Sequence, residues 1–406
     1  MLAFTFPGQG SLRPGMGRVW LEHPSWELVR DASDVVGRDI GHLLCDAAAP
    51  DLAETRNAQL ATFTLSLVVL DAVERLGVEP SLCAGHSLGE YTALAASGAI
   101  GFEEGLRLVA ERGEAMQDVA DDRPGKMAAL LGVSDDDAEV ACQRAESEVW
   151  VANYNAPGQV VVAGTEDGVD AAIGVARSMG MRKAVTLAVR GPFHTPLMVP
   201  ARQRLRKALA EVTFDSPGVP VVANVDARPH ADPADWPGLL STQLCSPVRW
   251  RHTLVNLYEE SHDLVMVELG GGGVLTGLAR RTLPGVRVAS VASPSDLDAF
   301  LQSLAEGAEL ASQGGGEHLY VSERIVVSPT TGTFEPEQRF ASLPPGSSIP
   351  SGDGLPLAVG DPVGKVGEMD VRSAFAGRLV GLLAHSGERV VDGQPVAWLR
   401  SSDPSA

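Results

Sequence analysis

The stretch Ala84-Gly85-His86-Ser87-Leu88-Gly89-Glu90-Tyr91 lies between a short apolar run that ends at Ala84 and a strongly helix-forming run at residues 92–96. Small residues two positions before and after a serine allow a sharp strand-to-helix turn, because bulkier side chains would clash with the neighbouring elements. Such a turn exposes the Ser87 hydroxyl and leaves the Leu88 N–H at a helix N-terminus, where it can stabilise an oxyanion. The pattern favours a nucleophile, although a tight turn with an idle serine fits it too.

The length and composition indicate a multidomain globular protein. A chain of 406 residues is too long for one ordinary core. No apolar run reaches the length of a membrane span, and the N-terminal residues lack the basic-then-apolar layout of a signal peptide. We therefore expect a cytoplasmic protein that does not bind membranes. The cysteines lie far apart, which favours reduced core thiols over disulfides or a metal site. They are Cys45, Cys83, Cys142 and Cys245.

The formal net charge of −20 argues against a nucleic-acid partner, which most of the surface would repel. An anionic substrate would therefore need a pocket built locally, from a placed arginine or from helix N-termini. Arg112 lies in a segment with apolar residues at helical spacing, residues 102–113. From this pattern alone, a solvated arginine is the commoner outcome.

The order of the expected elements predicts an α/β fold with an inserted subdomain. Residues 2–6 form a short buried strand that a glycine-rich turn follows. Residues 126–189 alternate as strand, helix, strand, strand, helix and strand, which is the ferredoxin-like order. We therefore assign residues 1–125 and 190–311 to a large subdomain and 126–189 to a small one.

Two further loops attract attention. His194 stands between Pro192 and Pro196, and this rigid setting suits a placed base as well as it suits a hydrogen-bonded structural histidine. The run Gly270-Gly271-Gly272-Gly273 follows a strand-like segment and precedes a helix, but it matches no phosphate-binding fingerprint. We expect it to serve close packing rather than a cofactor.

The tail differs in character from the rest of the chain. Residues 312–319 have the composition of a flexible linker, and residues 320–401 are rich in valine, proline and glycine. A weak internal echo, in which Ser328 and Ser373 each stand four residues before a glycine, suggests two similar all-β halves. An extra Pro/Gly/Ser-rich excursion near residues 342–354 is expected to be a loop.

Six motifs follow one another along roughly residues 1 to 305. In chain order they are Phe6–Gly10, Gly85–Glu90, Glu111–Gly113, Asn153–Gln159, Gly191–Met198, and Gln243-Leu244 before Ser246–Trp250. Together they resemble the malonyl-CoA:acyl-carrier-protein acyltransferase family. The resemblance implies an α/β-hydrolase-like domain with a ferredoxin-like insert, which agrees with the element order above.

The resemblance implies a catalytic set. Ser87 is the implied nucleophile and His194 its base, with the backbone carbonyl of Gln243 orienting the imidazole. The backbone N–H groups of Gln9 and Leu88 match the oxyanion hole of the family. A neutral carbonyl stabilises an imidazolium less than a carboxylate does, and our hypothesis is that this favours acyl transfer over hydrolysis.

The resemblance also implies the substrate. Arg112 matches a buried arginine that grips the free carboxylate of malonyl, a role suited to a planar, two-pronged donor. Phe193 and Asn155 are implied substrate contacts, and Phe193 is typical of members that prefer malonyl. Pro192 stands where the family usually has alanine, and we expect it to reshape the pocket rim. The implied reaction moves malonyl from malonyl-CoA to the thiol of a phosphopantetheinylated acyl carrier protein by a ping-pong route, in fatty acid or polyketide biosynthesis, without metal or cofactor.

Residues 320–401 resemble a biotinyl/lipoyl-attachment domain, through residues 371–377 and 387–396. An attachment hairpin carries a lysine between methionines at its tip. Here Lys365, the only lysine of the segment, stands in Val363-Gly364-Lys365-Val366-Gly367. We therefore expect an unmodified domain.

Three other functions stay open at this point. The chain could be a trans-acting acyltransferase that moves an acyl group other than malonyl between two carrier proteins. The chain could instead be an editing hydrolase that removes acyl groups from carriers, in which case water would outcompete the thiol. A third reading treats residues 1–310 as a non-enzymatic scaffold, which the presence of Ser87, His194 and Arg112 argues against.

Overall fold

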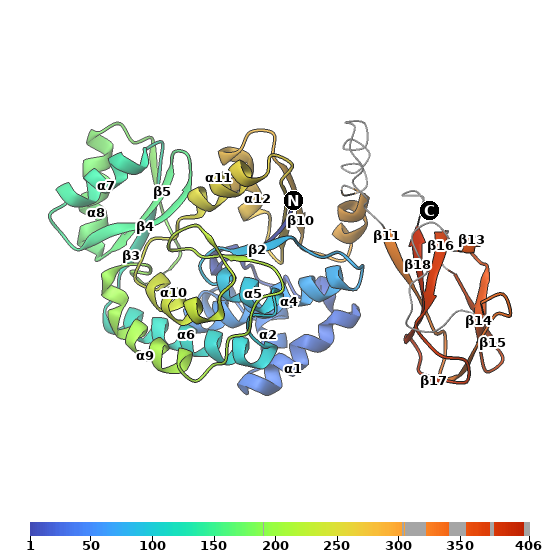
Figure 1. The fold of residues 1–406 in the computed structure, drawn as a ribbon. Coiled ribbons are helices and arrows are strands. Elements are labelled where there is room, and N and C mark those ends of the chain that lie inside the picture. Colours follow the sequence, from blue (N-terminus) through green and yellow to red (C-terminus); the bar gives the residue numbers. More distant parts are fainter. Residues whose placement is uncertain (190, 303, 305–321, 341–354, 374–376, 402–406) are drawn as a thin grey trace. The chain divides into compact units, whose positions relative to one another are not determined.

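The computed structural model describes the chain except for residues 190, 303, 305–321, 341–354, 374–376 and 402–406 (Figure 1). The chain divides into two compact units, Met1–Phe300 and Leu301–Ala406. The expected linker at 312–319 and the expected loop at 342–354 lie outside the described residues. In the described part of the chain, no helix is both long and apolar enough to cross a membrane.

The first unit is built on a largely parallel sheet with the strand order β10-β9-β1-β2-β7-β8. All neighbours pair in parallel except β7 with β8. Strands β1, β2 and β9 are almost fully buried, as expected for parallel strands that helices cover on both faces. The strands are β1 (Leu2–Phe6), β2 (Leu82–Gly85), β7 (Val221–Val222), β8 (Pro229–His230), β9 (Val265–Leu269) and β10 (Arg287–Val291).

Helices cover both faces of this sheet. Leu254 of α11 and Leu278 of α12 belong to one apolar cluster with Ala3, Leu82 and Met266 of the strands. Figure 1 shows α4, α5 and α6 on the opposite side. Helix α4 is buried on nearly every side, which explains its apolar residues all round. The helices are α1 (Glu27–Val36), α2 (Ile40–Cys45), α3 (Ala49–Leu52), α4 (Thr55–Glu74), α5 (Gly89–Ala96), α6 (Phe102–Asp122), α9 (Val199–Leu209), α10 (Trp236–Gln243), α11 (Trp250–Glu260) and α12 (Val274–Thr282).

A second, antiparallel sheet of the first unit has the strand order β4-β5-β3-β6. Its elements are β3 (Lys126–Leu131), α7 (Asp135–Arg144), β4 (Val149–Ala156), β5 (Gln159–Gly164), α8 (Glu166–Ser178) and β6 (Lys183–Thr186). Ser134 caps α7 by accepting a hydrogen bond from the Asp137 N–H. Val248 joins this sheet to the segment before α11, because its N–H and C=O bond Ala152 O and Tyr154 N at 2.9 Å each.

The second unit contains two four-stranded antiparallel sheets, ordered β11-β18-β16-β13 and β15-β14-β12-β17. Phe334, Phe340, Val363 and Leu399 are buried in one apolar cluster. The strands are β11 (Ser322–Val327), β12 (Gly332–Pro336), β13 (Leu355–Leu357), β14 (Pro362–Val366), β15 (Met369–Arg372), β16 (Gly377–Leu382), β17 (Arg389–Val390) and β18 (Pro395–Ser401).

The structure differs from the sequence-based expectation at the edges of the large sheet. Strand β7 has only two residues, and its partner β8 was not expected. Strand β10 was not expected either; it is only partly buried until Val291. Edge strands need no continuous apolar run, so their sequence signal is weak.

Candidate active site

The Ser87 elbow is a tight turn between β2 and α5. Ser87 has a left-handed φ of 55°, which a non-glycine residue adopts only under constraint. A Cβ on Gly85 would lie 1.9 Å from the Gly89 carbonyl, and a Cβ on Gly89 would lie 2.0 Å from Phe6 O. Both positions therefore require glycine, which is the physical basis of the small-residue pattern.

Ser87 and His194 are in direct contact. The Ser87 Oγ to His194 Nε2 distance is 2.7 Å, and His194 Nδ1 lies 2.9 Å from the backbone oxygen of Gln243. Because a carbonyl oxygen only accepts, Nδ1 carries the proton and Nε2 is free to accept the Ser87 hydroxyl. The backbone of His194 is also left-handed, with φ 61°.

The imidazole is held neutral. His194 is 4% exposed. Burial and then the Arg112 guanidinium lower the pKa of His194 to about 3, against the smaller opposing effect of the Gln243 carbonyl. At neutral pH the group is therefore ready to accept a proton, as a general base must be.

Arg112 is fully buried in the same site, although the helical pattern favoured a solvated arginine. Its Nη1 donates to Gln59 Oε1 at 2.7 Å, and its Nη2 donates to Ser87 Oγ at 3.2 Å. Among the described residues, Nε has no hydrogen-bond partner. The guanidinium also lies over the Tyr91 ring, 5.3 Å from its centroid. It is thus a desolvated cation beside the serine oxygen, with donor capacity left for an anion.

The Gly8-Gln9 turn lies against the elbow, since a Cβ on Gly8 would be 2.9 Å from His86 O. Gln9 Oε1 accepts a hydrogen bond from Gln59 Nε2 at 3.2 Å. Leu88, which is 1% exposed, directly precedes the first residue of α5, where helix N–H groups have no partner within the helix. The structure therefore brings Gln9 and Leu88 to the same end of the sheet as Ser87.

The two implied substrate contacts, Asn155 and Phe193, are buried near the site, and both make structural contacts there. Asn155 Oδ1 lies 2.9 Å from His86 Nε2, so Asn155 holds the residue before the nucleophile. Phe193 is 3% exposed, and its ring would lie 2.2 Å from a Cβ on Gly191. That loop closes tightly because residue 191 is glycine.

Sequence reasoning missed two buried residues that hold the elbow. Asn224 Oδ1 accepts the Ser87 N–H at 2.7 Å, and Asn224 Nδ2 donates to Gly85 O at 2.6 Å. Glu90 accepts from the Asn224 N–H at 3.2 Å, and burial raises the pKa of Glu90 to about 7. Glu90 stands inside the elbow motif, whereas Asn224 follows a short strand and carries no sequence signal of its own.

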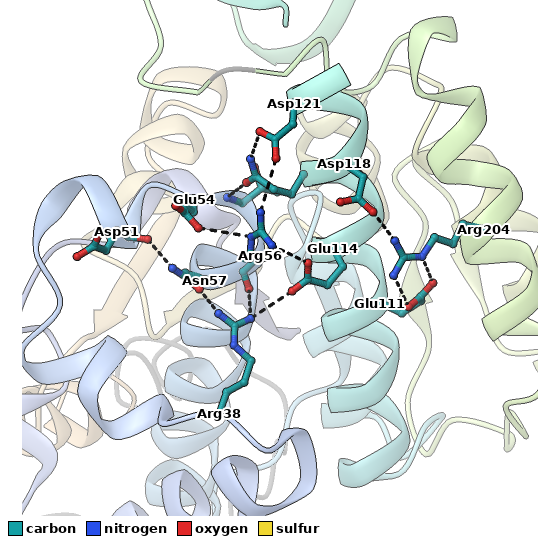
Figure 2. Close-up of polar contacts among 12 residues, drawn as sticks. Arg38, Asp51, Glu54, Arg56, Asn57, Glu111, Glu114, Asp118, Asp121 and Arg204 are labelled. Atoms are coloured by element: carbon teal, nitrogen blue, oxygen red, sulfur yellow. Dashed lines mark hydrogen bonds and ion pairs between the residues drawn. The ribbon is translucent and has the colours of Figure 1, made fainter. Parts of the chain in front are cut away.

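Ion pairs on the outer side of α6 fix the helix that carries Arg112 (Figure 2). They link α6 to the start of α4, to the α1–α2 connection and to α9. Exposed ion pairs contribute little stability, about 0–1 kcal/mol each, so we infer that this network serves mainly to orient α6. The pairs are Arg56–Glu114 at 3.1 Å, Arg38–Glu114 at 3.6 Å, Arg204–Asp118 at 2.6 Å, and Arg204 with Glu111.

A cavity of about 630 Å³ adjoins His194 and lies between that loop and the second sheet. Pro196, Cys245, Trp150 and Tyr154 are among its lining residues. All four cysteines are free thiols; Cys245 is partly exposed here and the other three are buried. Burial raises the pKa of the Cys245 thiol, so this thiol is a poor nucleophile.

The Gly270–Gly273 turn packs closely against neighbouring side chains. Gly270 has φ 92°, and a Cβ there would lie 2.5 Å from Ser66 Oγ. The Glu268 carboxylate accepts the Val274 and Thr276 N–H groups at 3.1 and 2.9 Å, which occupies the helix terminus that a phosphate would need. Over the described residues, no group of three or more His, Cys, Asp or Glu side chains could hold a metal.

Comparisons with known proteins place this geometry in a family. The acyl transferase domain family matches residues 3–308. The malonyl CoA-acyl carrier protein transacylase of Bacillus subtilis is 36% identical over 310 residues, which cover 75% of this chain and 98% of the relative. The crystal structure of an acyl carrier protein S-malonyltransferase from Vibrio cholerae matches with a TM-score of 0.70 at 37% identity, covering 74% of this chain and 99% of that chain.

A third structure, a type II PKS acyl-carrier protein in complex with its malonyl-transacylase, matches with a TM-score of 0.72 at 35% identity and covers 74% of this chain and 99% of that chain. The relatives and structures cover similar shares of this chain, 74–75%. The residues matched by the family model include Ser87, Arg112 and His194. The described mixed α/β fold is that of these structures. The chain therefore belongs to the acyl transferase domain family.

Proposed function

We propose that this protein transfers a malonyl group from malonyl-CoA to the phosphopantetheine thiol of an acyl carrier protein, through a malonyl ester on Ser87. One observation carries the proposal: Ser87 Oγ lies 2.7 Å from His194 Nε2 and 3.2 Å from the buried Arg112 guanidinium. A nucleophile, a base and an anion-binding cation thus meet at one oxygen. The names of the relatives support the same substrates.

The first half-reaction loads the serine. As Ser87 Oγ attacks the thioester carbonyl, His194 Nε2 takes the hydroxyl proton. The Gln9 and Leu88 N–H groups stabilise the oxyanion that forms. Collapse of the tetrahedral intermediate breaks the C–S bond, and His194 returns its proton to the departing CoA thiolate. A malonyl ester remains on Ser87.

The second half-reaction reverses these steps with a new thiol. His194 takes the proton of the phosphopantetheine thiol, the sulfur attacks the ester, and the proton returns to Ser87 Oγ. The proposed role of Arg112 in both halves is to hold the far carboxylate with two charge-assisted hydrogen bonds, which keeps the carbonyl beside Ser87. Phe193 and Asn155 are proposed to line the acyl site.

The domain organisation proposed from the sequence is kept here as a proposal. The strand order β4-β5-β3-β6 with two helices supports a ferredoxin-like subdomain at 126–189, inserted in an α/β-hydrolase-like domain at 1–125 and 190–311. The two sheets of the second unit support a biotinyl/lipoyl-like domain at 320–401. Lys365 lies within β14, opposite Asp370 of β15, rather than in the turn between the strands. This supports an unmodified lysine.

Intact mass spectrometry tests the function. The protein is mixed separately with malonyl-CoA, methylmalonyl-CoA and acetyl-CoA, with and without a phosphopantetheinylated carrier, and S87A serves as the control. We expect a malonyl increment that is lost in S87A and moves to the carrier when the carrier is added. Preferred loading of an uncharged group, or release of free malonate faster than carrier loading, would favour the carrier-to-carrier or hydrolase alternatives instead.

A further inference from the structure

Glu90 is a buried acid to which the proposed reaction assigns no step. It lies in the first turn of α5, three residues after Ser87, and is fully buried. Its Oε2 accepts hydrogen bonds from Gln243 Nε2 at 2.8 Å and from the Asn224 N–H at 3.2 Å. Its Oε1 has no hydrogen-bond partner within the described chain. A buried carboxylate that is half satisfied is costly and calls for an explanation.

Gln243 links Glu90 to Arg112. The Gln243 side-chain nitrogen donates to Glu90 and also to Ser87 O at 2.8 Å, so its Oε1 faces the other way and accepts from Arg112 Nη2 at 3.0 Å. If the amide were reversed, its N–H groups would face the guanidinium. The Glu90 carboxylate therefore fixes the amide orientation that Arg112 requires. The backbone oxygen of the same Gln243 holds His194.

The positive charge of Arg112 is balanced by the negative charge of Glu90, to which the Gln243 side chain connects it. Arg112 donates hydrogen bonds to Gln59, Ser87 and Gln243, which are all neutral. The charged groups that act on Glu90 are Arg112 of α6 and, more weakly, Asp226 of the β7–β8 connection. Tyr91 also faces Arg112, but burial raises the pKa of its phenol well above the ordinary value, so the phenol stays neutral. Glu90 is thus the buried anion that is paired with the guanidinium, across one amide.

We propose that Glu90 is the counter-charge of Arg112 in the unloaded enzyme, and that it takes up one proton when the malonyl carboxylate replaces it as the partner of Arg112. This inference rests on the proposed malonyl transfer. The reactants are malonyl-CoA, the Ser87 hydroxyl, the Glu90 carboxylate and one proton from solvent. The products are the malonyl ester of Ser87, the CoA thiol and the neutral carboxylic acid of Glu90. The net charge of the buried site is then the same before and after loading.

The direction of the effect follows from the site. Two carboxylates beside one guanidinium would leave an excess negative charge in a dry environment, and a nearby like charge raises the pKa of a carboxyl group. In the unloaded enzyme, burial already raises the pKa of Glu90 to about 7. A second anion therefore shifts Glu90 from partly ionised to protonated at the pH of the reaction.

Proton uptake during loading tests the inference. Enzyme at high concentration is mixed with malonyl-CoA in weak buffer at pH 7.5 with an indicator dye, and a free-CoA blank corrects for the thiol. The signal is divided by the amount of ester measured by intact mass. We expect about half a proton to one proton taken up per ester in the wild type and none in E90Q. The matched control is E268Q, which removes another fully buried carboxylate that bonds α12; it should leave the uptake per ester unchanged.

The outcomes separate the two proposals. An ester that forms without proton uptake in the wild type, or with undiminished uptake in E90Q, overturns the role of Glu90 and leaves the malonyl transfer standing. The absence of any ester overturns the proposed function, and this inference with it. If E90Q does not fold, the wild-type uptake still decides.

Kinetics distinguish a positioning role from a purely structural one. In E90Q, the amide oxygen can still accept hydrogen bonds from Gln243 and Asn224, whereas the negative charge is lost. The substitution should therefore change the pH dependence of KM more than it changes kcat. The KM for malonyl-CoA should rise above pH 7 in the wild type, by up to about tenfold per pH unit, and stay flat in E90Q. E90A also loses the acceptor and should lose kcat. Parallel pH profiles in wild type and E90Q would overturn the inference.

Discussion

The Arg112→Ala substitution is the most informative perturbation of the substrate site. Arg112 is fully buried, and the hydrogen bonds it donates to Gln59, Ser87 and Gln243 hold it beside the nucleophile. Removing one partner of a buried charged pair costs about 2–5 kcal/mol. Since each 1.36 kcal/mol is a factor of about ten in rate, kcat/KM for malonyl loading should fall about 30- to 5,000-fold.

The assay is the rate of malonyl-Ser87 formation in rapid-quench samples, read by intact mass. Arg112→Lys should recover only part of the loss, because an ammonium lacks the two-pronged geometry. Arg107→Ala is the matched control on the same helix, since the Arg107 side chain is 59% exposed and pairs with Glu103 on the surface. Acetyl loading should fall much less than malonyl loading in R112A. Near-normal malonyl loading by R112A would refute the assignment of a carboxylated substrate.

Three further outcomes are expected. The pKa of His194 is lowered from 6.5 to about 3 in the folded protein, so the unfolded chain binds the proton first and the free energy of unfolding should fall as pH drops from 6.5 towards 3. The urea midpoint should fall more steeply with decreasing pH in the wild type than in H194Q, and equal slopes would contradict this. Gly89→Ala should abolish malonyl loading and lower the melting temperature, because the new Cβ would lie 2.0 Å from Phe6 O, and a G89A enzyme with normal loading would contradict the elbow argument. Gly174→Ala in α8 has open space around the new Cβ and should raise the free energy of unfolding by about 0.5–1 kcal/mol. Co-expression with a biotin ligase should add no biotin mass, since Lys365 lies within a strand; an increment on Lys365 would contradict this.

The sequence was most informative where local sterics and chemistry coincide. The elbow glycines are dictated by contacts of about 2 Å to the backbone, so the motif predicts the turn directly. The Ser87–His194 contact joins residues that are 107 positions apart, and only the resemblance to a family brought them together. Spacing alone also suggested a solvated Arg112, because a helical pattern does not show which polar residue a neighbouring helix covers.

The residues that sequence reasoning missed act through tertiary contacts. Asn224 bonds Ser87 from 137 positions away, and Gln59 lies in a helix whose apolar pattern gave no reason to single it out. Glu90 was visible inside the elbow motif, but its burial and its link to Gln243 appear only in three dimensions. The short edge strands β8 and β10 were missed for a different reason, since a partly exposed edge imposes little apolar pattern.

The most direct test of the account is the structure of the malonyl-loaded enzyme, trapped with malonyl-CoA in the absence of a carrier. The account predicts an ester on Ser87 Oγ, with the free carboxylate within about 3 Å of two Arg112 nitrogens. An ester on any other residue would contradict the account, as would a Ser87 ester whose carboxylate points to solvent while Arg112 keeps its bonds to Gln59 and Gln243.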